Sequence, residues 1–281
     1  MPRLRSMIST VALGAAVALA CDAKSPTTPP SSPDAAPEQT APMQASKLDD
    51  ARGGRLYDKW TAEAGVEVDG AKRLKNIYGW DMRGAEGVYG PKYQNKSGVS
   101  PRNLLATQQS EEELVAWLTD GDAELPGLGA HVDEADLRDL ATFIAMMQRG
   151  ELPGPDAFFT LSETAPKNYV LVAGADPTRG QTTYADACSH CHGEDGTNIA
   201  IDETLSLGAF MRTKAYEGWF KILNGHPGST MGREIEFDSA DDAASQTLGI
   251  MAALCDRATF PPLEGQSDVA DDDPRCAAYL K

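Results

Sequence analysis

The spacing of apolar side chains predicts three helices in the second half of the chain. The first is expected to run from Pro177, behind the N-cap Asp176, to Cys188, because proline favours the first helical position. The second follows Thr213 in the stretch KAYEGWFKILNG and stops at Gly225. The third follows the loop HPGSTMGRE and a cap at Asp238 or Ser239, and its apolar side chains are Leu248, Ile250, Met251 and Leu254.

The first half of the chain repeats this order of helices. When Arg52-Gly53 is placed over Arg179-Gly180, Tyr57 falls on Tyr184 within a similar helical pattern. The repeat continues with a middle helix and a last helix, as in the second half. The pattern therefore predicts an all-α protein with two similar helical parts.

Both later helices of the first half have clear ends. The middle one begins with the capping box of Ser110 and Glu113 and ends near Gly121. The last one runs from a cap at Asp133 to Gly150, and its apolar face holds Leu137, Leu140, Phe143, Ile144 and Met147.

Proline and glycine mark a boundary between the two halves. The stretch GELPGPDAFFTLSETAPKNY predicts a helical domain at 48–152, a linker at 153–172 and a second domain at 173–281. An unrelated small helical domain is the alternative for the first half.

Residues 1–20 have the pattern of an export signal. Two arginines precede an apolar stretch that is too short to span a bilayer, and Ala18-Leu19-Ala20 is a cleavage pattern. The same residues before Cys21 are similar to a bacterial lipobox, so lipidation and simple secretion both stay open. Residues 21–47, rich in Pro, Ser, Thr and Ala, are expected to form a disordered tether or terminus. We expect a periplasmic protein of the bacterial cell envelope, anchored in the membrane through a lipid at Cys21.

Acidic residues outnumber basic ones, 42 to 25, and give the 281-residue chain a formal net charge of −17. Proteins that neutralise phosphates need clustered Lys and Arg, so this balance argues against nucleic-acid binding. It favours a redox protein partner with a basic docking surface. A solvated acidic surface without a specific partner is the alternative.

The chain has five cysteines, of which Cys21 belongs to the N-terminal segment. Cys188 and Cys191 lie in a common motif. Export places the remaining two in an oxidising compartment, where a pair is expected to be bridged. A Cys255–Cys276 disulfide would fix the C-terminal tail to the last helix, and two separate buried thiols are the alternative.

The most informative stretch is ADACSHCHGEDG, in which Cys188, Cys191 and His192 form the pattern C-x-x-C-H. Chance explains it poorly, since a shuffled chain of this composition would contain it with a probability on the order of one in a thousand. A zinc site would need a second ligand pair, and a thioredoxin-like dithiol would need a βαβ context. The pattern favours covalent haem, because two thiols one helical turn apart bind the haem edge and the histidine binds the iron.

The helices around this motif resemble a class I cytochrome c, over about residues 177–255. In that family a helix leads into C-x-x-C-H, a middle helix follows, a loop carries the distal methionine, and a last helix crosses the first. The resemblance implies one covalent haem c. Its thioether residues would be Cys188 and Cys191, its proximal iron ligand His192 and its distal iron ligand Met231.

Two roles around the haem stay open. His226, Met211 or an open sixth position are the alternatives to Met231 as the distal ligand. Trp219 either donates a hydrogen bond to a haem propionate or packs in the core.

The first half resembles a cytochrome c domain that has lost its haem site. In the alignment above, Thr61-Ala62-Glu63-Ala64-Gly65 occupies the motif positions, so no ligand role carries over. The segment 66–100, with Tyr78, Trp80, Tyr89 and Tyr93, is expected to fill the space of the haem. His131 lies near the expected distal loop, but a lone histidine is more often a surface or packed residue.

These features predict an exported electron carrier rather than an enzyme. A His–Met pair saturates the iron, which leaves no position for a substrate, and methionine ligation raises the reduction potential. The haem-less half would serve as a docking or spacer module. The alternatives are a haem-containing subunit of a periplasmic oxidoreductase complex and a haem-based gas or redox sensor with a labile sixth ligand.

Overall fold

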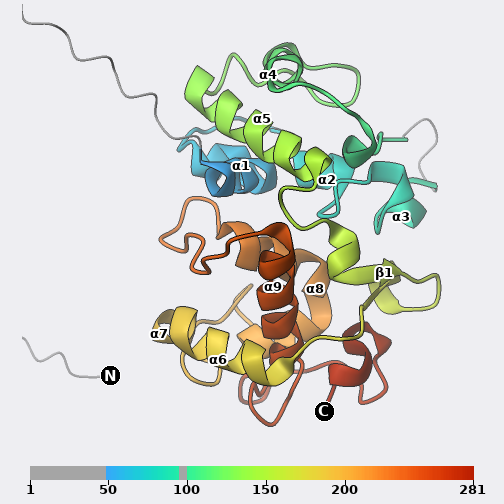
Figure 1. The fold of residues 1–281 in the computed structure, drawn as a ribbon, viewed down its shortest axis with the longest axis vertical. Coiled ribbons are helices and arrows are strands. Elements are labelled where there is room, and N and C mark those ends of the chain that lie inside the picture. Colours follow the sequence, from blue (N-terminus) through green and yellow to red (C-terminus); the bar gives the residue numbers. More distant parts are fainter. Residues whose placement is uncertain (1–48, 95–99) are drawn as a thin grey trace, which may run out of the picture. The chain divides into compact units, whose positions relative to one another are not determined.

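The computed structural model describes residues 49–94 and 100–281, and in these ranges the chain is mostly helical (Figure 1). The all-α prediction is therefore confirmed at the level of helix content. The helices are α1 (Asp50–Glu63), α2 (Leu74–Tyr78), α3 (Gly90–Gln94), α4 (Glu111–Asp120), α5 (Glu134–Arg149), α6 (Pro177–Ala187), α7 (Ser189–His192), α8 (Leu207–Asn224) and α9 (Ala240–Leu254). Short 3-10 helices lie at Gly84–Glu86, Leu104–Ala106, Pro155–Ala157, Pro166–Asn168 and Pro274–Tyr279.

A short antiparallel hairpin interrupts the helical pattern. Its strands are β1 (Phe159–Leu161) and β2 (Tyr169–Leu171), with Phe159 opposite Leu171. The hairpin lies in the segment predicted as a linker between the halves. Phe158, which precedes it, stacks on Trp219 of α8 with ring centroids 4.9 Å apart. Phe158, Phe159 and Tyr169 therefore anchor this segment in the packed core, while most of the hairpin turn is exposed.

The predicted signal at 1–20, the tether at 21–47 and the lipidation site Cys21 lie outside the described residues. Within 49–94 and 100–281, no helix is long and apolar enough to cross a bilayer. Contacts group Ser46–Lys281 into one compact unit, which includes both predicted halves and the segment between them.

In each half the first helix crosses the last one at a glycine. A Cβ atom on Gly53 of α1 would lie 2.1 Å from the carbonyl oxygen of Asp139 in α5. A Cβ atom on Gly180 of α6 would lie 1.9 Å from the carbonyl oxygen of Gly249 in α9. Only glycine allows two helix backbones to approach this closely. The two crossing points are the positions that the alignment of the halves matches.

The caps of the two first helices are also equivalent. Asp49 accepts a hydrogen bond from the backbone N–H of Arg52 at 3.0 Å, and Asp176 accepts one from the backbone N–H of Arg179 at 3.1 Å. Each arginine side chain also forms an ion pair with an aspartate of the last helix in its own half. The internal repeat is thus present in helix caps and packing as well as in sequence.

Aromatic side chains fill the interior of the first half. Tyr78, Trp80 and Tyr93 are buried, and Tyr89 packs against Tyr216 with ring centroids 6.0 Å apart. These are the four aromatic residues that the sequence assigned to the space of a lost haem. His131 is exposed at the surface, where its ring stacks on that of Trp60 with centroids 5.8 Å apart.

The middle helix of the second half begins earlier than predicted. α8 starts at Leu207, behind the N-cap Ser206, and not after Thr213. The backbone departs from helical geometry at Lys214, where φ is −138°, and the amide just beyond donates to the hydroxyl of Tyr169 at 2.9 Å. The Tyr169 side chain, from a strand distant in sequence, therefore stabilises a break in α8. Because of this break, the local spacing of apolar residues did not predict the part of α8 before Lys214.

A buried ion cluster joins the two halves. Asp58 of α1, only 2% exposed, pairs with Lys75 at 3.0 Å and with Lys221 of α8. The two ammonium groups also lie over the ring of Trp80, 4.1 Å and 5.2 Å from its centroid. A buried carboxylate requires such partners because an unpaired charge is costly to remove from water.

The disulfide between Cys255 and Cys276 is present and closes a segment with a sequence separation of 21. It fixes the C-terminal 3-10 helix to the end of α9. Replacing both cysteines by alanine is expected to lower the free energy of unfolding by about 3 kcal/mol, because the unfolded chain regains its loop entropy. Chemical denaturation of the two proteins measures this difference. A reductant should destabilise the wild type and leave the variant unchanged; a wild type indifferent to reductant would contradict the prediction.

Candidate functional site

The C-x-x-C-H motif lies where α6 ends and α7 begins. Cys188 is the C-cap of α6. Its carbonyl oxygen accepts hydrogen bonds from the backbone N–H groups of Cys191 and His192, at 3.3 Å and 3.1 Å. Gly193, with φ of +84°, ends α7. The carbonyl of Gly193 accepts from the buried hydroxyl of Tyr184 at 2.6 Å, which fixes the end of the motif to α6.

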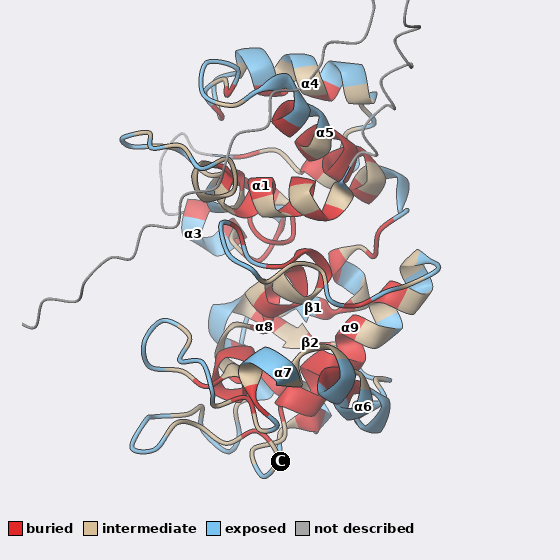
Figure 2. Ribbon diagram, turned by 90° about the vertical axis from the view of Figure 1, so that its left-hand side faces the viewer, coloured by how far each residue is buried: buried red, intermediate tan, exposed pale blue. Residues whose placement is uncertain are grey.

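Both motif thiols are unbridged, and they differ in exposure. Cys188 is half-buried and Cys191 is exposed. None of the residues of α7 is buried, and Figure 2 shows this helix on the surface beside α6. The sulfur of Cys191 therefore lies at the surface, whereas that of Cys188 is partly covered.

The environment of Cys188 does not favour thiol–disulfide exchange. Burial raises the pKa of this thiol to about 11, and the nearby Glu234 and Cys191 act in the same direction. A reactive dithiol needs a lowered pKa, because the thiolate is the nucleophile.

His192 is half-buried, and burial favours the uncharged form of its ring. Burial, with a smaller effect of His190, lowers the pKa of His192, so the neutral imidazole is the stable form near neutral pH. Its buried Nδ1 atom has no hydrogen-bond partner among the described residues. A neutral ring with an unsatisfied nitrogen is suited to bind an iron atom.

Met231 lies in the loop between α8 and α9 and is half-buried. Its carbonyl oxygen accepts from the backbone N–H of His226 at 2.8 Å, and its own N–H donates to Ser229 Oγ at 3.2 Å. These bonds close the loop on itself and give it a defined backbone.

The two competing sixth ligands have different surroundings. His226 is exposed. Met211 is 1% exposed and lies inside α8, where its sulfur packs so close to Gly218 that a Cβ atom on this glycine would lie 2.7 Å away. Met211 is thus a core residue, and its sequence-based placement before the middle helix is wrong because α8 begins at Leu207.

Trp219 is fully buried between aromatic rings, and its Nε1 atom has no hydrogen-bond partner among the described residues. A buried indole N–H without an acceptor is costly. The stacking of Trp219 on Phe158 agrees with the alternative that Trp219 packs in the core. The other alternative, a hydrogen bond from Trp219 to a haem propionate, stays a prediction.

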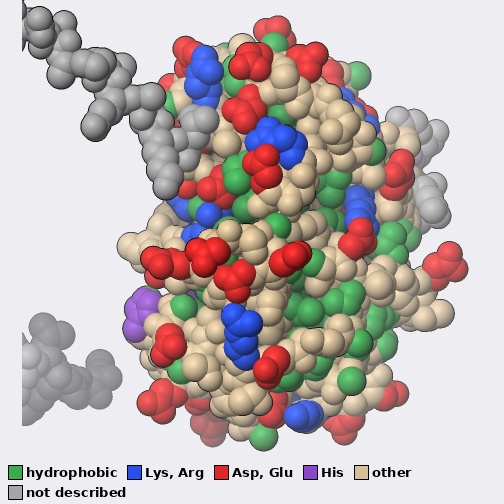
Figure 3. Space-filling view, in the orientation of Figure 1, with side chains coloured by type: hydrophobic (Ala, Val, Ile, Leu, Met, Phe, Trp, Pro, Cys, Tyr) green, Lys and Arg blue, Asp and Glu red, His purple; other side chains and the backbone are tan. Residues whose placement is uncertain are grey.

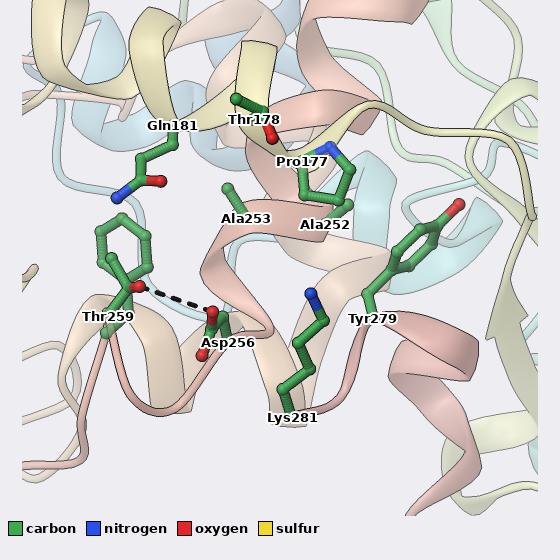
Figure 4. Close-up of a pocket in the computed structure, with 10 residues that line it drawn as sticks. Pro177, Thr178, Gln181, Ala252, Ala253, Asp256, Thr259, Tyr279 and Lys281 are labelled. Carbon is green, nitrogen blue, oxygen red and sulfur yellow. Dashed lines mark hydrogen bonds between the residues drawn. The ribbon is translucent and has the colours of Figure 1, made fainter.

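Two hollows in the described surface lie away from the motif. One of about 620 Å³ lies beside the end of the loop that carries Met231, and its lining residues are Arg233, Ile235, Glu236, Phe237, Asp238 and Asp242. The other, of about 130 Å³, lies between the start of α6 and the end of α9 (Figure 4). This hollow is too small for a large cofactor. Its polar lining includes Thr259 and Asp256, whose side chains are joined by a hydrogen bond.

The described residues contain no group of three or more His, Cys, Asp or Glu side chains that could hold a metal ion by themselves. A covalently attached haem asks a different set of groups from the protein, namely two thiols and a ring nitrogen. Two unpaired thiols one turn apart and the unpartnered nitrogen of His192 fit such a group.

Comparison with known proteins gives no family. No family model and no curated protein matches the chain. One solved structure, the reducing HAO-like protein complex of Kuenenia stuttgartiensis, is similar over 72% of this chain and 95% of its own, with 13% identity and a TM-score of 0.22. A likeness this low carries no argument about function.

Proposed function

We propose that this chain is an exported mono-haem c-type cytochrome that transfers electrons. The observation that carries the proposal is the C-x-x-C-H motif at the end of α6, with two unbridged thiols and a neutral, half-buried His192 whose Nδ1 has no partner among the described residues. The disulfide of Cys255 and Cys276 supports it further, because it leaves the motif thiols available for haem.

Four residues would attach the haem and bind its iron, and further residues would hold these four in position. Cys188 and Cys191 would hold the haem through thioethers, and His192 and Met231 would bind its iron. The haem supplies a centre that accepts and releases one electron at a time. Tyr184 holds the end of the motif, and the closed loop around Met231 limits how far the sulfur can move.

The surroundings proposed for this carrier follow from charge and from the N-terminal sequence. Figure 3 shows acidic side chains spread over the face in view, with fewer basic ones between them. Such a surface suits a brief encounter with a redox protein that has a basic docking patch. We propose a periplasmic location with a lipid anchor at Cys21, from which the segment 21–47 carries the folded unit.

Absorption spectra of the protein matured with haem test this function. The reduced wild type is expected to ignore carbon monoxide, because Met231 occupies the sixth position, whereas Met231→Ala should bind it readily. The matched control is Met146→Ala, which removes a half-buried methionine from α5 in the other half. A wild type that binds carbon monoxide at once would move the assignment towards a gas sensor or an oxidoreductase subunit.

A further inference from the structure

The loop between α8 and α9 rests on the first half of the chain. It is held there by α1, the helix that matches the haem-binding helix α6 in the internal repeat (Figure 1). Three contacts, at Asn224, Gly228 and Arg233, connect the end of α8 and the first part of the loop to this helix.

The first contact lies at the end of α8. Arg55 of α1 donates to the carbonyl oxygen of Asn224 at 3.1 Å. At this point Gly54 faces the Asn224 side chain so closely that a Cβ atom on this glycine would lie 2.3 Å from it. The loop thus leaves α8 from a fixed position against α1.

The second contact uses Glu63, the last residue of α1. Its carboxylate accepts from the backbone N–H of Gly228 at 3.0 Å and from Arg55 at 2.9 Å. Gly228 also lies against α1, because a Cβ atom on it would lie 2.8 Å from the carbonyl oxygen of Ala62. Hydrogen bonds to a charged acceptor are about twice as strong as neutral ones.

The third contact closes the loop beyond Met231. Arg233 forms an ion pair with Asp50 of α1 and donates to the carbonyl oxygen of Leu223 at 2.7 Å. Met231 therefore lies between two points, Gly228 and Arg233, that are both tied to carboxylates of the same helix.

We infer that Glu63 and Asp50 of the haem-less half are positioning residues for Met231, and that this half holds the distal ligand in place. The inference rests on the proposed function, since it gives Met231 a haem iron to bind. In the internal repeat Glu63 stands where the second half has His190, inside the haem motif. The segment that matches the motif in the first half thus braces the ligand loop of the second.

Carbon monoxide is the probe, because it competes with Met231 for the sixth position. In the reduced haem-loaded protein, Glu63→Ala combined with Asp50→Ala should speed carbon monoxide binding about tenfold or more, since each lost charged hydrogen bond favours release of the loop. Glu63→Gln keeps an acceptor for Gly228 and should stay near the wild type. Glu134→Ala, which removes an exposed carboxylate of α5, is the control.

Hydrogen exchange of the loop amides gives a second readout that does not depend on the haem. The Gly228 amide should exchange about tenfold faster in Glu63→Ala and remain protected in Glu63→Gln. Should the double variant fail to fold, Glu63→Ala alone is decisive, because it leaves the Asp50–Arg233 pair in place. Unchanged carbon monoxide binding in Glu63→Ala, with a methionine-ligated wild type, would overturn this inference alone. A wild type without covalent haem would overturn the proposed function as well.

Discussion

Replacing Cys188 and Cys191 together by alanine is expected to abolish covalent haem attachment completely. The two thioether bonds need these two sulfur atoms, and no other described cysteine is free, because Cys255 and Cys276 are joined to each other. The wild type should gain the mass of one haem and keep it through denaturation. Mass spectrometry of the denatured proteins measures both outcomes.

The matched control for this experiment is the double variant of Cys255 and Cys276. It also removes two cysteines, but it should keep one covalent haem per chain because these residues lie outside the motif. Cys188→Ala alone should leave a single thioether at Cys191 and a less stable attachment. A wild type that matures without any gain in mass would refute haem attachment and return the motif to an undetermined role.

Replacing Gly180 by alanine is expected to destabilise the folded unit by about 3 kcal/mol or more, since overpacking of this kind forces backbone shifts. The new Cβ atom would lie 1.9 Å from the carbonyl oxygen of Gly249, and a backbone atom cannot move aside as a flexible side chain can. α6 and α9 would have to separate at their crossing. For a unit of this size the melting temperature should fall by roughly 6–12 °C.

Two other glycine-to-alanine variants serve as comparisons for Gly180→Ala: one at the equivalent helix crossing of the first half, and one at a glycine with open space around it. Gly53→Ala places a Cβ atom 2.1 Å from the carbonyl oxygen of Asp139 and should destabilise the first half to a similar extent. Gly154→Ala meets no atom within 4 Å, at an ordinary backbone angle, and should leave the melting temperature unchanged. Equal melting temperatures for all three variants would show that the helix crossings do not depend on these glycines.

The ends of several helices were predictable because they depend on a few neighbouring residues. Ser110 and Glu113 form the predicted capping box, and Asp133 caps α5. Ser239, one of two candidates, caps α9. In each case a side chain bonds a backbone N–H within three residues, so the signal is contained in a short stretch of sequence.

The start of α8 shows why other boundaries were missed. The backbone bends at Lys214, and the amide beyond it bonds the hydroxyl of Tyr169, which lies 46 residues away in β2. A local pattern carries no information about a partner so distant in sequence. The hairpin of β1 and β2, in a segment predicted as a linker, was missed because each strand has only 3 residues, too few for a clear pattern. Phe158, directly before β1, packs on Trp219 of α8, a contact that the local sequence does not show.

The sequence by itself determined the chemistry available at the site. It placed Cys188, Cys191 and His192 together through their spacing in one short motif, and it predicted the disulfide between the two remaining cysteines that the structure confirms. The tertiary structure alone decided what holds the loop of Met231. The bond from Gly228 to Glu63 joins residues 165 positions apart, and only folding of both halves into one unit brings such groups within hydrogen-bond distance.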